Sequence, residues 1–299
     1  DTTDAVGLYT SLAIGADGYP VISHQNSGSG DLLFVKCADL SCSTISTSTT
    51  IIDNGAANSV GLYTTITIGS DGYPAISYQD GTAGALKFAK CNDASCFSTT
   101  IRTLQDITDA VGLYSSLGIG ADGYPVISHR NSGSGDLLFV KCSNLSCSTI
   151  STSTAILDNG GTASVGTFSS LAIGSDGYPV ISYQDNTTAD LKFAKCHDLS
   201  CSSTTIRMLE DVGAVGLYTS LAIGSDGYPV ISHHDSTPGA LKFFRCSSVD
   251  CAPVGSSTAN MSATSTDLSI VLDDAGSVAV ASSDNTYDTI QGATSTRIA

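Results

Sequence analysis

The chain has 299 residues and a formal net charge of −16, with 28 acidic side chains against 12 basic ones. This excess of acid disfavours nucleic acid and anionic membrane surfaces as partners, because both are bound through lysine and arginine. Glycine is abundant and Glu210 is the only glutamate, so the composition favours strands and turns over helices. No apolar run reaches the roughly 20 residues needed to cross a bilayer, and no membrane insertion is expected.

The first unit of the chain is predicted to contain four antiparallel strands. They cover residues 9–14, 19–24, 32–37 and 43–52. Asp17-Gly18, between the first two strands, is a hairpin signal flanked by apolar runs. Four antiparallel strands in about 50 residues match the size of one β-propeller blade.

This unit repeats along the chain. The first glycine of a Gly-x-Asp-Gly-Tyr-Pro element recurs at Gly15, Gly69, Gly120, Gly174 and Gly224. A regular period of about 50 residues is typical of an array of one supersecondary unit. A degenerate sixth unit follows, with inner strands predicted at 268–272 and 278–281 and outer strands at 287–291 and 294–298.

The predicted fold is therefore all-β: a six-bladed β-propeller of four-stranded antiparallel blades, with a degenerate last blade. We expect one domain over 1–299, with blades at about 5–54, 55–105, 106–159, 160–210, 211–260 and 261–299. The repeated element from Gly15 to Ser23 resembles that of bacterial secreted or surface β-propeller repeat proteins. This resemblance implies the architecture and no activity, because propellers carry many different functions.

Ten cysteines form five pairs with four residues between the partners. The pairs are Cys37/Cys42, Cys91/Cys96, Cys142/Cys147, Cys196/Cys201 and Cys246/Cys251. A hairpin loop of this length is expected to put the two cysteines opposite each other on antiparallel strands, within disulfide reach. Zinc is the alternative, but no repeat supplies a histidine pair to complete a site. Disulfides predict an oxidising compartment and a secreted or cell-surface protein.

One repeated position combines an aromatic ring with a nearby amide or carboxylate, a pairing common in sugar-binding sites. The candidate ligand-binding residues are His24, Asn26, Tyr78, Asp80, His129, Asn131, Tyr183, Asp185, His233 and Asp235. All are expected on the side of the blades that carries the loops between second and third strands. Repeated weak sites gain affinity through avidity. The alternatives are a structural role at the strand end, and duplication of the repeat without function in each copy.

No catalytic residue, cofactor or metal site is predicted. The aspartates of the Asp-Gly turns are explained by the turns, and glycoside hydrolysis needs two carboxyl groups with different environments. His233-His234-Asp235 contains the only adjacent histidine pair, which is a weak metal signal without further ligands. Three glycosylation sequons begin at Asn144, Asn186 and Asn260.

These observations predict a non-enzymatic extracellular protein with a structural or adhesive role, including self-assembly into a surface layer or fibre. Its expected partners are copies of itself, other surface components or glycans. A multivalent carbohydrate-binding lectin is the first alternative, and a secreted hydrolase is the second.

Overall fold

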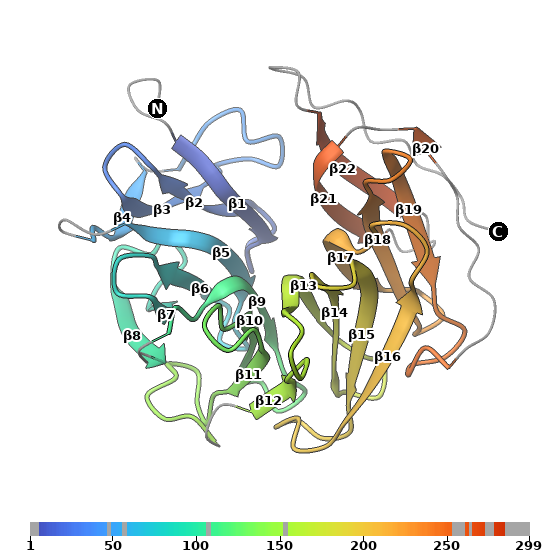
Figure 1. Ribbon diagram of the computed structural model, residues 1–299. Coiled ribbons are helices and arrows are strands. Elements are labelled where there is room, and N and C mark those ends of the chain that lie inside the picture. The colour runs from blue at the N-terminus through green and yellow to red at the C-terminus, as the bar shows by residue number, and fades with distance from the viewer. Residues whose placement is uncertain are drawn as a thin grey trace. The chain divides into compact units, whose positions relative to one another are not determined.

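The computed structural model describes residues 6–46, 49–55, 59–105, 109–151, 155–252, 261–262, 265–272 and 278–284. These residues form five four-stranded antiparallel sheets and one two-stranded sheet (Figure 1). The all-β prediction is confirmed. The part of the chain that the structure describes holds no helix long and apolar enough to span a membrane.

In each four-stranded sheet, the order of the strands in space follows their order in the chain. The first sheet holds β1 (Val6–Ile14), β2 (Pro20–Asn26), β3 (Asp31–Lys36) and β4 (Thr50–Asp53). The second holds β5 (Val60–Ile68), β6 (Pro74–Asp80), β7 (Ala85–Cys91) and β8 (Thr99–Gln105). The third holds β9 (Leu113–Ile119), β10 (Pro125–Arg130), β11 (Leu137–Lys141) and β12 (Ala155–Asp158). The fourth holds β13 (Val165–Ile173), β14 (Pro179–Asp185), β15 (Asp190–Cys196) and β16 (Thr204–Glu210). The fifth holds β17 (Leu217–Ile223), β18 (Pro229–Asp235), β19 (Ala240–Arg245) and β20 (Met261–Ser262).

The last predicted blade is described only in its inner strands. β21 (Ser265–Leu272) and β22 (Val278–Asp284) form an antiparallel pair, at the positions predicted for them. The two outer strands predicted at 287–291 and 294–298 lie outside the described residues. Five of the six predicted blades are therefore seen as four-stranded sheets, and the sixth is seen as a pair of strands.

The chain divides into two compact units. Unit 1 comprises Asp1–Ser134 and Leu138–Ala155, and unit 2 comprises Gly135–Leu137 and Ile156–Ala299. Within each unit, successive sheets pack face to face across apolar layers. Leu32 and Phe34 of the first sheet pack with Ile76 of the second, and Phe193 of the fourth sheet packs with Ile231 of the fifth.

The second strand is the most deeply buried strand of the second and fourth sheets. Every residue of β6 and every residue of β14 is buried. Because these strands pack on both faces, their sequences cannot show the in–out alternation of a sheet that is half exposed. The predicted ligand-binding residues at the ends of these strands are therefore largely inaccessible to a ligand.

All five predicted disulfides are present, and the Cα atoms of each pair lie 4.7–4.9 Å apart. The bonds are Cys37–Cys42, Cys91–Cys96, Cys142–Cys147, Cys196–Cys201 and Cys246–Cys251. The pairing predicted from the cysteine spacing is therefore confirmed.

The predicted position of the second cysteine in each pair is wrong. The residue opposite Cys37 is Ile45, and the residue opposite Cys91 is Thr99, so the disulfide does not join facing residues of two strands. The second cysteine lies inside the loop, where the backbone is left-handed with φ between 48° and 53°, at Cys42, Cys96, Cys147, Cys201 and Cys251. The physical reason is a turn within the loop, in which the Cys42 N–H donates to the carbonyl of Asp39 at 3.1 Å.

The side chain of Asp39 also shapes the first disulfide loop. It accepts hydrogen bonds from the backbone N–H groups of Ser43 and Thr44. These donors are therefore satisfied within the loop. Ser43 and Thr44 therefore belong to the loop, and the fourth strand of the first sheet begins at Thr50 rather than at residue 43, where the sequence predicted it.

Candidate functional site

The predicted ligand-binding residues lie at or beside the ends of the second strands, but they do not form an exposed surface. His24 is half-buried. The other nine are buried: Asn26, Tyr78, Asp80, His129, Asn131, Tyr183, Asp185, His233 and Asp235. The physical reason is that these strands lie inside the stack of sheets. Their polar groups are used between neighbouring sheets and in turns.

In the second sheet, the predicted residues Tyr78 and Asp80 belong to an ion cluster. The Tyr78 hydroxyl donates to Asp53 Oδ2 at 2.8 Å, across the boundary with the first sheet. Lys87 Nζ lies 2.6 Å from Asp53 Oδ2 and 3.7 Å from Asp80 Oδ2. Burial works to raise the pKa of Asp53, but the hydrogen bonds from Lys87 and Tyr78 hold it below its ordinary value. The cluster joins the two sheets.

The same ion cluster recurs in unit 2. In the fourth sheet, its members are Tyr183, Lys192 and Asp185, and they are joined by Asp158 from β12. In the fifth sheet, its members are His233, Lys242 and Asp235, and they are joined by Glu210 from β16. Lys192 Nζ lies 2.8 Å from Asp185 Oδ2, and His233 Nε2 lies 3.2 Å from Glu210 Oε2. Glu210, the only glutamate, therefore holds a lysine and a histidine.

The third sheet carries a neutral version of this cluster. Here His129, Leu138 and Asn131 stand in place of the tyrosine, the lysine and the aspartate, and Gln105 stands in place of the acid from the preceding sheet. The N–H of Gly112 donates to His129 Nδ1 at 3.3 Å, so the neutral ring carries its proton on Nε2. Complete burial lowers the pKa of His129 to about 4.

His129 should make the stability of the protein depend on pH. The unfolded histidine takes up a proton near pH 6.5, whereas the folded one does so near pH 4. Between these values the unfolded state binds more protons, so stability falls as the pH is lowered through this window, by up to about 3 kcal/mol. Denaturant unfolding of His129→Asn should show a loss of stability between neutral pH and pH 4.5 that is about 2–3 kcal/mol smaller than in the wild type. His197→Asn is the control, because His197 is exposed. An unchanged pH dependence in His129→Asn would contradict the assignment.

The exposed repeated aromatic residues are elsewhere, at the turn between the first and second strands. Aspartate Oδ1 accepts the N–H of the tyrosine two residues later, as at Asp71 and Tyr73, which confirms the turn role of these aspartates. The aspartate also pairs with the last basic residue of the third strand. The pairs are Asp17–Lys36, Asp71–Lys90, Asp122–Lys141, Asp176–Lys195 and Asp226–Arg245.

We call Tyr19, Tyr73, Tyr124, Tyr178 and Tyr228 the turn tyrosines. The first four expose 38%, 39%, 37% and 37% of their surface. In the second sheet, Lys90 Nζ lies 5.4 Å from the centre of the Tyr73 ring, and the same arrangement recurs at Tyr124 and Tyr178. Each of these rings is therefore held beside a fixed ion pair. Neighbouring turns touch: Ser70 Oγ donates to Gly123 O at 3.0 Å.

A second repeated aromatic set lies in the first strand of each sheet. The register between β5 and β6 shifts across Tyr63 and Thr64, which places an extra residue in β5 as a bulge. Tyr63 adopts a φ of 51°, a left-handed conformation that is unfavourable for a bulky side chain. The residues with this conformation, which we call the bulge aromatics, are Tyr9, Tyr63, Tyr114, Phe168 and Tyr218.

The bulge has a structural role in its backbone. Ser115 Oγ, from the third sheet, donates to the carbonyl of Tyr63 at 2.8 Å. In unit 2, Thr219 Oγ1 donates to the carbonyl of Phe168 at the same distance. The bend therefore joins the first strands of neighbouring sheets, although a backbone bond of this kind does not require an aromatic side chain.

Sequence reasoning missed both aromatic sets. The sequence predicts each turn tyrosine as the first residue of a second strand and each bulge aromatic as the first residue of a first strand, with no further role for either. For the bulge aromatics a signal was present, because a Gly-Leu-Tyr or Gly-Thr-Phe triplet recurs in the first five repeats. Strand formation does not require either triplet, so its recurrence pointed to a further structural role.

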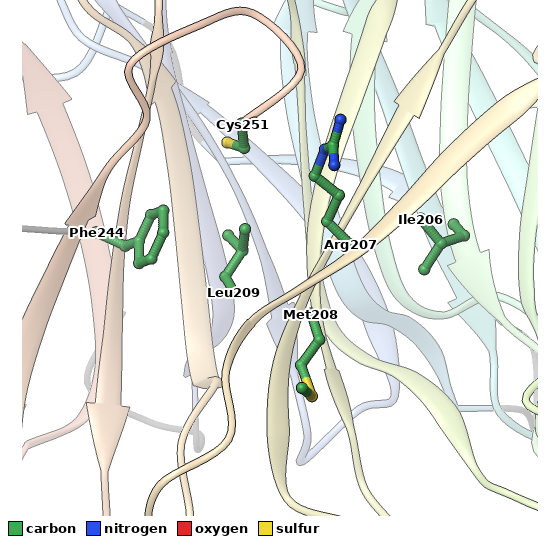
Figure 2. Close-up of a pocket in the computed structure, with 6 residues that line it drawn as sticks. All are labelled: Ile206, Arg207, Met208, Leu209, Phe244 and Cys251. Carbon is green, nitrogen blue, oxygen red and sulfur yellow. The ribbon is translucent and has the colours of Figure 1, made fainter. Parts of the chain in front are cut away.

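Unit 2 also has a pocket of about 260 Å³ between β16 and the fifth sheet (Figure 2). It is lined by Ile206, Arg207, Met208, Leu209, Phe244 and Cys251. The Arg207 guanidinium is already paired with Asp250 at 2.8 Å, so the lining is mainly apolar. No group of three or more histidine, cysteine or acidic residues suited to a metal ion occurs among the described residues.

The sequons differ in accessibility. The Asn144 amide donates to Ser148 and Thr149 inside its disulfide loop, whereas Asn186 is exposed after β14. Asn260 lies outside the described residues.

Comparison with solved structures shows β-propeller-like proteins. A protein of unknown function from Dyadobacter fermentans is 11% identical, with a TM-score of 0.69 over 98% of this chain and 94% of that one. An α-L-arabinofuranosidase of Fusarium graminearum, solved with arabinobiose, is 9% identical, with a TM-score of 0.63 over 94% and 90%. A mutant of Aleuria aurantia lectin, in complex with Fucα1-6GlcNAc, is 11% identical, with a TM-score of 0.53 over 95% and 93%. No protein-family model and no curated protein matches the sequence. At these identities the likeness shows the fold alone.

Proposed function

We propose that this chain is a non-enzymatic, extracellular adhesive protein that binds neutral glycans through its turn tyrosines. In this proposal it is a single six-bladed propeller, and each turn contributes one weak site. The observation that carries the proposal is the exposed tyrosine ring held beside an aspartate–lysine pair in successive sheets.

The geometry of the turn suits a sugar. An exposed ring supplies a stacking surface, and the adjacent carboxylate supplies hydrogen-bond acceptors for hydroxyl groups. The Asp71 carboxylate is about one-third exposed while its partner Lys90 is buried, so the accessible polar group at each ring is mainly the acid. A net charge of −16 further favours neutral over anionic glycans.

Repetition explains why single sites of this kind are useful. Sites that are weak individually bind an immobilised polymer strongly when several engage at once. The structural neighbours include one protein solved with arabinobiose and one lectin solved with a fucosylated disaccharide, which supports a glycan ligand. The disulfides support an extracellular location.

The test is binding to an array of neutral and anionic glycans, followed by titration on an immobilised neutral glycan. Successive Tyr19→Ala, Tyr73→Ala, Tyr124→Ala and Tyr178→Ala changes should weaken binding stepwise, with at least a tenfold loss when all four are combined. Phe97→Ala is the matched control, because Phe97 is 70% exposed and lies in a disulfide loop. Absence of binding to any neutral glycan, or an equal loss in the control, would refute the proposal.

Self-assembly into a layer or fibre remains part of the same proposal. An adhesive protein with repeated sites could also bind copies of itself or other surface components. Light scattering of the purified protein tests this: a strictly monomeric protein at high concentration would remove self-assembly and leave glycan binding unaffected.

A further inference from the structure

Three tyrosines of unit 1 have their rings in direct contact. The ring centres of Tyr9 and Tyr63 are 4.8 Å apart, and those of Tyr63 and Tyr114 are 4.7 Å apart. The planes are tilted by 51° and 48°. The three residues come from the first strands of three successive sheets, β1, β5 and β9, so Tyr63 is the shared member of the row.

Packing alone does not account for the hydroxyl groups of this row. In unit 2 the equivalent pair is Phe168 and Tyr218, with ring centres 4.5 Å apart and planes tilted by 49°. A phenyl ring thus satisfies the same contact. The ring contact therefore does not require the hydroxyl groups that the three tyrosines of unit 1 carry.

We propose that Tyr63 is a site of oxidative cross-linking, at which its ring is joined to that of Tyr9 or Tyr114 as dityrosine. The oxidant is hydrogen peroxide, used by a peroxidase in the extracellular space. Each of two phenols loses one electron and one proton, and the two radicals form a carbon–carbon bond between positions ortho to their hydroxyl groups. The ortho hydrogens then move to the oxygens, which restores both phenols, while the peroxide is reduced to two molecules of water.

The structure provides what this coupling needs. Two phenoxyl radicals must meet before other reactions remove them, and rings already in contact satisfy that condition. Tyr9 is 41% exposed and gives the oxidant access, whereas Tyr63 is partly buried and held by the strand. Burial and its two tyrosine neighbours raise the pKa of Tyr63, so this shared phenol stays in its neutral form. Because Tyr63 is shared, one such bond is expected per chain.

The bond would join β1 to β5, or β5 to β9, by a covalent link between neighbouring sheets. Since the linked residues are about 50 positions apart in sequence, the cross-link would restrict the unfolded chain strongly. The proposal is independent of glycan binding, because it involves none of the turn tyrosines.

The experiment treats the full, disulfide-intact protein with hydrogen peroxide and a peroxidase. We expect monomer with dityrosine fluorescence, a mass lower by two hydrogens, and a higher midpoint of thermal unfolding. Trypsin cleavage places the three tyrosines in separate peptides, 1–36, 37–87 and 103–130, so peptide mapping identifies which pair is linked.

Three variants make the test specific. Tyr63→Phe should abolish the bond while the protein folds, because phenylalanine already occupies this position at Phe168. Tyr73→Phe removes a turn tyrosine from the same tryptic peptide and should leave the bond intact. Phe168→Tyr should add a second bond, to Tyr218. Cross-linking that persists in Tyr63→Phe, or that occurs only between molecules, would overturn the proposal.

Discussion

Replacing Lys87 by leucine should lower the free energy of unfolding by about 3 kcal/mol at neutral pH, because a largely buried ion pair is broken on one side only. Lys87 is the cation of the cluster in the second sheet, where it lies 2.6 Å from Asp53 and 3.7 Å from Asp80. The buried Asp80 and the partly buried Asp53 would then lie close together without a cation. Such a site raises the pKa of its carboxylates above their values in the unfolded chain. The loss in free energy of unfolding should therefore become smaller as the pH falls and the carboxylates are protonated.

The protein itself supplies the control for this substitution. The third sheet has leucine, asparagine, histidine and glutamine at the equivalent positions. The combined variant Lys87→Leu, Asp80→Asn, Tyr78→His and Asp53→Gln should therefore recover stability to within about 1 kcal/mol of the wild type. Denaturant unfolding measures both variants. The interpretation fails if the single variant is as stable as the wild type, or if the combined variant is no more stable than the single one.

A methyl group at Gly61 is the second change with a large expected effect. Gly61 has a φ of +84°, and a Cβ there would lie 3.1 Å from Leu32 Cα of the first sheet. Gly61→Ala therefore adds left-handed strain of about 1–2 kcal/mol to a collision with backbone that cannot rotate away. We expect a total loss of about 3 kcal/mol or more in denaturant unfolding.

Gly7 is the matched control for Gly61. It stands at the equivalent position of the first sheet with a φ of +86°, and a Cβ there would meet no atom of the described residues within 4 Å. Gly7→Ala should thus show only the conformational part, about 1–2 kcal/mol. Equal losses in the two variants would mean that the close approach of the second sheet to Leu32 does not limit this position.

Much of the fold could be predicted from the sequence because its signals are local and repeated. The Asp-Gly turns, the cysteine spacing and the apolar runs each predict one feature, and five copies confirm one another. The cysteine spacing predicts which residues are bonded, but not that Cys42 lies in a left-handed turn instead of facing Cys37. The fourth strand of the first sheet was predicted to start too early, and at Ser43 and Thr44 the reason is that Asp39 binds the backbone donors that the prediction assigned to the sheet. That competition depends on a side-chain orientation that no periodicity reveals.

The candidate site was harder to predict for a different reason. Tyr78 and His129 stand at strand ends among polar residues, which is typical of exposed sites, yet both are buried. A strand covered on both faces has no polar face in its sequence, so burial there depends on the packing of sheets and not on the strand itself. The left-handed conformation of Tyr63 is equally invisible, because nothing in an aromatic residue predicts a bulge.

The difference between the charged clusters and the neutral one has a consequence for how the repeats assemble. Near-identical repeats risk pairing with the wrong neighbour during folding, which is a characteristic failure of repeat proteins. If the third sheet packed where the second belongs, Asp53 would face Leu138 and lose the cation that Lys87 supplies. Such a mismatch would leave the partly buried Asp53 carboxylate without its cation, and this penalty discriminates against the wrong order. The clusters would then distinguish the neutral third sheet from the sheets that carry a lysine at this position, when neighbouring sheets pack during folding.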